Sequence, residues 1–205
     1  FLVAFLAWFN APALRMPGAV PTVTQGAGAF RIAFPSFCLA HAFPGLVLIG
    51  AAGAASHRAG VMGLDRATQL EIPSSVVDHT EYSSREEFDA KLIHEIDQYG
   101  ADLVVLAGFM RILTPDFVRR YKGRLINIHP SLLPKYKGLN THKRALEAGD
   151  KEHGVTVHFV SEDLDGGPNV IQAVVPVLDD DNEGSLKTRV QQQELIIYPI
   201  AVKWF

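Results

Sequence analysis

Two polar side chains suited to acid–base chemistry, Asn127 and His129, lie two residues apart near the end of a largely apolar run. Residues 125–128 predict a short buried strand, and Pro130 ends it because proline has no N–H for a sheet ladder. Alternate residues of a strand share a face, so both side chains would point together at the carboxyl end, where open α/β sheets bind ligands. For so short a motif, a turn-forming asparagine and a core histidine are the alternative.

The longer sequence around this pair resembles that of the folate-dependent formyltransferases. The motif NIHPSLLP at residues 127–134, followed by KYKGL and TH, carries the resemblance, which extends from about Ser56 to Phe205. Further matching stretches are GLDRA at 63–67, SREEFD at 84–89, VVLAGFMRIL at 104–113 and HGVTVHFVSEDLDGGPNVIQ at 153–172. The resemblance implies an α/β, Rossmann-like formyltransferase fold with a mostly parallel sheet, helices on both faces and an antiparallel C-terminal part.

The resemblance also implies an activity, the transfer of a formyl group from 10-formyltetrahydrofolate to the amine of glycinamide ribonucleotide in cytoplasmic purine biosynthesis. Its catalytic residues would be Asn127, His129 and Asp165. The Asn127 amide and a protonated His129 would stabilise the developing oxyanion, His129 would act as general acid, and Asp165 would orient the imidazole. Without the resemblance, Asp165 before two glycines would be only a turn former.

The resemblance assigns the binding residues as well. Folate contacts fall on Arg85, Met110, Arg111, Ile112, Leu113 and Asn127. Arg85 lies in the first turn of a predicted helix, an unfavourable place for a cation, which suits an anionic partner such as a folate glutamate tail. Gln191 and Glu194, three residues apart on another predicted helix, would approach the ribonucleotide. A solvated arginine and a solvated helix face are the alternatives.

The local patterns place these residues on alternating elements. Strands are predicted at residues 72–77, 102–109, 155–160 and 170–177, and helices at 84–100, 117–121, 141–148 and 186–197. Thr114 and Pro115 suit the N-cap and first position of the second helix. His158, on the third strand, is expected to pack or to form structural hydrogen bonds rather than to contact substrate.

The alternatives are two related enzymes, a binding protein and a membrane-attached variant. Methionyl-tRNA formyltransferase would need a basic extra domain and has Leu-Asp-Thr-Gly where this chain has Leu-Asp-Gly-Gly at 164–167. Formyltetrahydrofolate deformylase has a second histidine where this chain has Pro130. A non-catalytic, folate-binding remnant of the family is the third alternative, and a membrane-attached variant is a fourth.

Residues 1–64 have an unusual composition, without Asp, Glu or Lys and with Arg15, Arg31 and Arg58 as the only full charges. We expect residues 1–55 to be foreign to the family, for example through a shifted reading frame, and residues 56–205 to form a formyltransferase domain without the usual first strand and phosphate loop. The family's Gly-Ser-Asn turn would fall near residues 32–35, which read IAFP. Prolines and glycines interrupt residues 32–55, which argues against a membrane span, and no basic region precedes the apolar start at residues 1–9, which argues against a signal peptide.

The remaining composition narrows the partners. A chain of 205 residues with a net charge of −3 suits one domain and offers no general attraction for nucleic acid, so the expected partners are small molecules. The single Cys38 cannot form an internal disulfide, and no Cys or His cluster has metal-ligand spacing, so no metal is expected. The sequence leaves a homodimer open.

Overall fold

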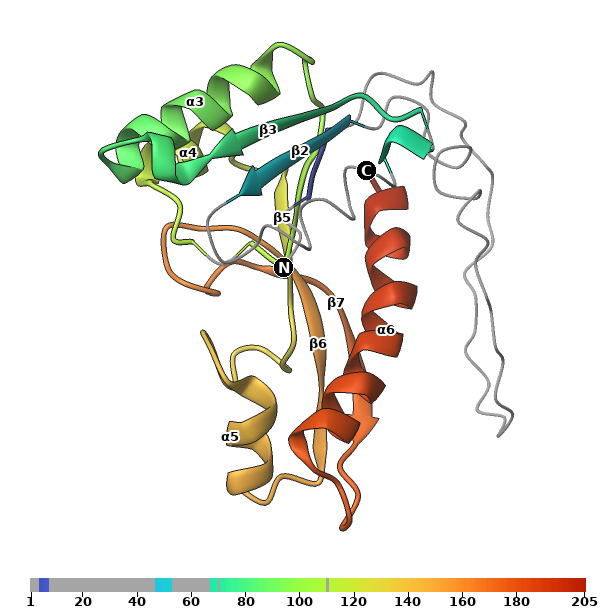
Figure 1. Ribbon diagram of the computed structural model, residues 1–205. Coiled ribbons are helices and arrows are strands. Elements are labelled where there is room, and N and C mark those ends of the chain that lie inside the picture. Colours follow the sequence, from blue (N-terminus) through green and yellow to red (C-terminus); the bar gives the residue numbers. More distant parts are fainter. Residues whose placement is uncertain (1–3, 8–46, 53–66, 70, 110) are drawn as a thin grey trace.

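The computed structural model describes residues 4–7, 47–52, 67–69, 71–109 and 111–205, so Met110 and most of residues 1–55 lie outside the described part (Figure 1). The strands are β1 (Ala4–Ala7), β2 (Val47–Ala52), β3 (Ser74–Asp78), β4 (Val104–Ala107), β5 (Leu125–His129), β6 (Glu152–Phe159) and β7 (Asn169–Pro176). The helices are η1 (His79–Glu81), α3 (Arg85–Asp97), α4 (Pro115–Arg120), α5 (Thr141–Glu147) and α6 (Glu183–Lys203).

Helices cover both faces of the central sheet, as the sequence predicts. Alternate residues of β4 point to opposite faces, so Val104 and Leu106 join a core cluster with α3 and α4, whereas Val105 joins a second cluster with α6. Figure 1 shows α3 and α4 packed together on one side of the strands and α6 running along the other. The strand β4 is therefore buried on both faces, which explains its continuous apolar sequence.

The sheet is more mixed than predicted. Its strand order is β3-β2-β1-β4-β5-β6-β7. Only the β2–β3 and β4–β5 pairings are parallel, and the other described pairings are antiparallel. One cause is the expected antiparallel C-terminal part, β5 to β7. The other is β1, which lies antiparallel between β2 and β4 and joins the two parts of the described sheet.

The helix boundaries follow local capping signals. The Ser84 side chain accepts a hydrogen bond from the Glu87 N–H at the start of α3. Thr114 caps α4 with Pro115 in its first turn, as predicted. The last helix begins earlier than predicted, because Asn182 and Ser185 form a capping box, and continues past Pro199 to Lys203. None of the described helices is long and apolar enough to cross a membrane.

Two buried histidines make the fold sensitive to acid. His142 Nδ1 and His153 Nε2 are 3.1 Å apart, and burial, followed by the neighbouring His142, lowers the pKa of His153 to about 4. The unfolded chain therefore binds more protons than the folded chain between pH 6.5 and about 4, so the free energy of unfolding falls as the pH decreases through this window. We expect His153 alone to account for a loss of about 3 kcal/mol.

Urea unfolding at pH 7 and pH 4 measures this loss. The substitution His153→Gln removes the titrating group and should make the difference between the two pH values smaller. His94→Gln, at an exposed position on α3, should leave the difference as it is in the parent chain. An equal pH dependence in the His153→Gln variant and the parent would contradict the assignment.

Candidate active site

Strand β5 carries Asn127 and His129, and strand β6 faces both of them. In the antiparallel pairing, Asn127 lies opposite His158 and His129 lies opposite Thr156. The His129 side chain is 8% exposed, and His158 is also buried. The predicted pair is therefore part of a polar patch that extends over two neighbouring strands.

The turn after β6 brings Asp165 to His129. An Asp165 carboxylate oxygen, Oδ2, lies 3.4 Å from His129 Nδ1 and accepts the Gly138 N–H at 2.9 Å. The backbone of Asp165 is left-handed, with φ at +46°. A Cβ at Gly167 would lie 1.9 Å from the Phe159 carbonyl oxygen, so only glycine allows the turn this close to the strand. The glycines after Asp165 thus help to place its carboxylate.

Both ring nitrogens of His129 face acceptors. Nε2 lies 2.9 Å from the Tyr136 carbonyl oxygen, and because a carbonyl only accepts, Nε2 donates and carries a proton. Nδ1 faces the Asp165 carboxylate, with 3.4 Å between Nδ1 and Oδ2. The ring of His129 therefore lies between a backbone carbonyl and a carboxylate, two groups that accept hydrogen bonds.

Tyr136 itself is held from several sides. Its hydroxyl donates to Asp150 Oδ2 at 2.8 Å, and the guanidinium of Arg144 lies 5.1 Å from the centre of its ring. Its backbone is left-handed, with φ at +55°. The carbonyl that receives the His129 proton is therefore fixed by the loop between β5 and α5.

A second set of hydrogen bonds fixes the turn that follows His129. The Thr156 hydroxyl donates to the Ser131 carbonyl at 2.6 Å and accepts the Leu133 N–H at 3.0 Å. Gln172 on β7 donates to the same hydroxyl at 2.8 Å and to the Leu133 carbonyl at 3.0 Å. The polar residues Thr156 and Gln172 thus hold the end of β5 in place from the two strands beyond it.

His158 has a larger part in the site than the sequence suggests. Its Nδ1 lies 2.9 Å from the Phe159 carbonyl and donates to it, while Nε2 lies 3.4 Å from Asn127 Nδ2 and 3.6 Å from Asp165 Oδ1. Burial lowers the pKa of His158, which favours the neutral ring with a free acceptor at Nε2. His158 therefore orients the Asn127 amide. The available signal was that His158 shares a strand face with the polar residue Thr156.

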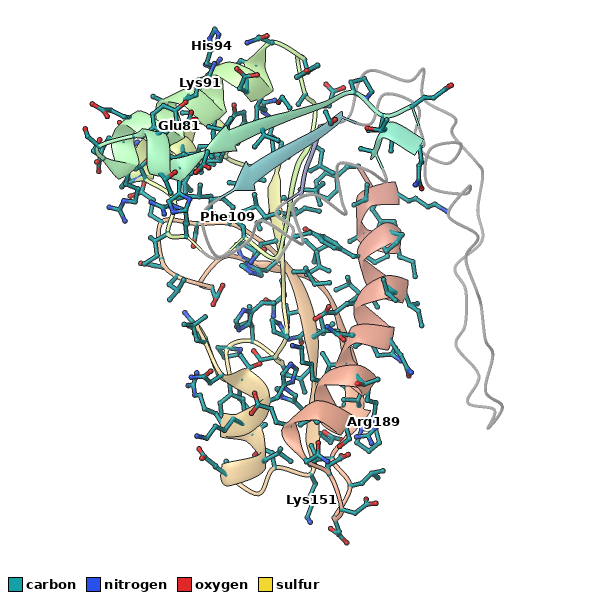
Figure 2. All side chains as sticks on the ribbon, in the orientation of Figure 1. Glu81, Lys91, His94, Phe109, Lys151 and Arg189 are labelled. Carbon is teal, nitrogen blue, oxygen red and sulfur yellow. The ribbon has the colours of Figure 1, made fainter. Side chains whose placement is uncertain are left out.

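The predicted folate residues come after β4, and the described residues that follow this strand, 108–109 and 111–113, are called the β4 segment. The β4 segment leaves the sheet at the same edge as His129. The parallel register pairs Leu106 with Asn127, and Gly108 then turns the chain with φ at +66°. Ile112 is 60% exposed, whereas Leu113 packs against the core cluster of α3 and α4, as does Phe109, which is labelled in Figure 2. Met110 lies outside the described residues.

The two predicted folate arginines lie on the α3 side of this segment. Arg111 is exposed and its guanidinium lies 5.2 Å from the centre of the Phe88 ring. Arg85 is in the first turn of α3, as predicted, with a side chain that is 44% exposed. Among the described residues, neither arginine hydrogen-bonds to Asn127, His129 or Asp165, so the arginines and the catalytic residues form two separate sets.

The two residues predicted to bind the ribonucleotide are separate from the catalytic group. Gln191 is exposed, and Glu194 is half-buried, with its pKa raised by burial and lowered in part by Lys187. Among the described residues, no hydrogen bond joins either side chain to Asn127, His129 or Asp165. One turn beyond Glu194, the hydroxyl of Tyr198 donates to the Leu106 carbonyl, which ties this part of α6 to β4.

A carboxylate, an imidazole and an oriented amide at the carboxyl edge of an α/β sheet define a protein class suited to acyl or formyl transfer. The sequence pattern of the formyl transferase family matches residues 50–202, and the chain belongs to this family. The resemblance and the fold class stated from the sequence are thereby confirmed, and so is the enzyme class, a transferase.

Named relatives agree with this assignment. Phosphoribosylglycinamide formyltransferase of Escherichia coli is 57% identical over 150 residues, which cover 73% of this chain and 71% of the relative. The trifunctional purine biosynthetic protein adenosine-3 of Drosophila melanogaster is 53% identical over 147 residues, or 72% of this chain and 11% of that protein. The solved phosphoribosylglycinamide formyltransferase of Coxiella burnetii has 55% identity and a TM-score of 0.67, covering 70% of this chain and 67% of the solved one.

Proposed function

We propose that this chain binds 10-formyltetrahydrofolate and transfers its formyl group to the amine of glycinamide ribonucleotide. The observation that carries the proposal is the contact of Asp165 with His129, beside Asn127 and at the edge where the β4 segment leaves the sheet. The names of the close relatives support a purine biosynthetic substrate and do not favour the transfer-RNA enzyme or the deformylase.

Asn127 supplies a hydrogen-bond donor for the formyl oxygen. Of the two hydrogens on Nδ2, one points to His158 Nε2, and the second is free to donate to an acceptor beyond the strand end. Negative charge develops on the formyl oxygen as the amine attacks, and a donor already oriented stabilises it without reorganisation. His158 acts here as a positioning residue through Asn127.

His129 supplies the second donor and the acid. The Nε2 proton is held by the Tyr136 carbonyl, so donation to the reacting groups requires that this hydrogen bond be exchanged for one to the substrate. Asp165 stabilises the charged ring from Nδ1 and prevents its rotation. The attacking amine loses a proton, and the folate nitrogen that leaves has to gain one. Among the described residues, His129 is the group that can donate a proton to the leaving nitrogen.

The residues after β4 and at the start of α3 have the chemical types that binding of a folate requires. The formyl-folate supplies the activated formyl carbon, an apolar ring system and an anionic glutamate tail. Exposed Ile112 offers apolar surface, and Arg85 and Arg111 offer positive charge. Gln191 and Glu194 are proposed to bind the ribonucleotide. The cytoplasmic location, the homodimer and the domain boundary at residue 56 stay predictions.

A substitution in the β4 segment tests the folate site. Ile112→Asp introduces a charge at an exposed apolar position and should raise KM for 10-formyltetrahydrofolate about tenfold while kcat at saturation is retained. Formyl transfer is followed by mass spectrometry of the ribonucleotide product, with the ribonucleotide in excess. Leu178→Asp, an equal change at an exposed position after β7, is the matched control and should leave KM unchanged. The absence of any product in the parent chain would contradict the proposed transfer.

A further inference from the structure

Asp89 is a buried carboxylate that the proposed transfer reaction does not use. It lies on α3, is 2% exposed, and accepts the backbone N–H of Thr114 at 2.6 Å. Thr114 follows directly after the proposed folate residues and caps α4. Asp89 therefore fixes the point where the β4 segment ends, across a separation of 25 residues in the sequence.

Both proposed folate arginines lie near the same carboxylate. Arg85 lies four residues earlier on α3, hence one turn away on the same side of the helix, and Arg111 lies beside α3 over the face of the Phe88 ring. Burial raises the pKa of Asp89 and outweighs the hydrogen bonds from Thr114 and the charges of Arg85 and Arg111, which lower it. These three residues thus offset part of the cost of burying the negative charge.

We propose that Asp89 is a positioning residue of the folate site, which fixes the segment 111–114 through Thr114 and places Arg85 and Arg111 for an anionic ligand. The inference rests on the proposed function, because it assumes that these arginines contact the folate. Both arginines are solvent-accessible, so their charges are not enclosed in a buried ion pair. Arg85 also forms an exposed ion pair with Glu86 at 3.9 Å, whereas the guanidinium of Arg111 lies over the face of the Phe88 ring.

A purely structural function of Asp89 predicts different results. A buried carboxylate that only held α3 against α4 would be replaceable by a neutral acceptor without any effect on the ligand, since the hydrogen bond from Thr114 would persist. A positioning function predicts that loss of the charge alone weakens folate binding. The two explanations therefore differ in the affinity of the folded protein and not in its stability.

Calorimetric titration of the full chain with 5-formyltetrahydrofolate, a stable isomer of the co-substrate, measures the difference. We expect Asp89→Ala to raise Kd about tenfold or more, and Asp89→Asn to raise it about threefold, because the amide oxygen still accepts the Thr114 N–H. KM for the formyl-folate should rise in parallel while kcat at saturation stays within about twofold.

Asp181→Asn provides a matched control. Asp181 is an enclosed carboxylate, with a side chain that is 3% exposed, and it pairs with Arg189 at 2.6 Å. Arg189 lies at the opposite end of the molecule from Glu81 and Lys91, which mark the region of η1 and α3 (Figure 2). This variant should lower Tm and leave the Kd for the folate unchanged.

The outcomes separate this inference from the proposed function. A folded Asp89→Ala variant with the parent Kd overturns the inference, and if that variant does not fold, a parent Kd in Asp89→Asn does so. A Kd that rises on Ile112→Asp but on neither Asp89 substitution overturns the inference alone. A parent chain that does not bind the folate overturns the inference together with the proposed function.

Discussion

Replacement of Asp165 with asparagine is expected to lower kcat by about three to four orders of magnitude. The carboxylate faces His129 Nδ1 at 3.4 Å. Asparagine can still accept the Gly138 N–H, so the turn should keep its position, but the neutral amide no longer stabilises the charged ring. The loss should appear in kcat and not in folate affinity, since only the transition state needs the proton donor.

Single-turnover measurements of formyl transfer, with the ribonucleotide at saturating concentration, separate this effect from binding. Asp163→Asn is the control, because Asp163 lies in the same turn and is exposed. It should retain the kcat of the parent, and calorimetry should give the same folate Kd for both variants and the parent. A kcat for Asp165→Asn within about tenfold of the parent would show that His129 does not depend on this carboxylate.

The elements that the sequence predicts well are those specified by local chemistry. Serine, threonine and proline at helix starts gave α3 and α4, and apolar runs gave β3 to β7. The two-residue spacing of Asn127 and His129 placed both on β5. Asp165 is different, because its turn sequence is common, and only the resemblance to a family connected it with His129.

Contacts between residues that are far apart in the chain could not be predicted from the sequence. The Tyr136 carbonyl is a backbone group, so no residue type indicates that it receives the His129 proton. The interaction of His158 with Asn127 depends on the register between β5 and β6. Asp89 looks like one of several acidic residues on an exposed helix until the fold places Thr114 beside it. In each case the partner lies too far along the chain for a spacing rule to identify it.

The packing of residues 111–113 decides which of them is the better position for a test of folate binding. From the sequence, residues 111–113 are all expected to lie at the end of a buried strand beside the catalytic residues. Leu113 packs against the core cluster of α3 and α4, so a charge there would destabilise the fold as well as any ligand contact. Ile112 is 60% exposed and separates the two effects.

Binding of the ribonucleotide is expected to be much weaker than binding of the folate. The ribonucleotide phosphate carries about two negative charges, and the phosphate loop by which the family receives it is not recognisable in residues 1–55. Lysine is absent from residues 1–64, and Arg15, Arg31 and Arg58 are the only cations there apart from histidine. The family match begins only at residue 50.

Calorimetric titration of this chain and of the Escherichia coli relative with glycinamide ribonucleotide compares the two phosphate sites directly. Each charge-assisted hydrogen bond to the phosphate contributes roughly 1.5 to 3 kcal/mol, so loss of two of them should raise Kd at least about 100-fold. Titration of both proteins with 5-formyltetrahydrofolate is the control and should give similar Kd values, because Arg85, Arg111 and Ile112 lie within the matched region. Equal ribonucleotide affinity in the two proteins would show that residues 1–55 do form a phosphate site, and the proposed domain boundary at residue 56 would then be wrong.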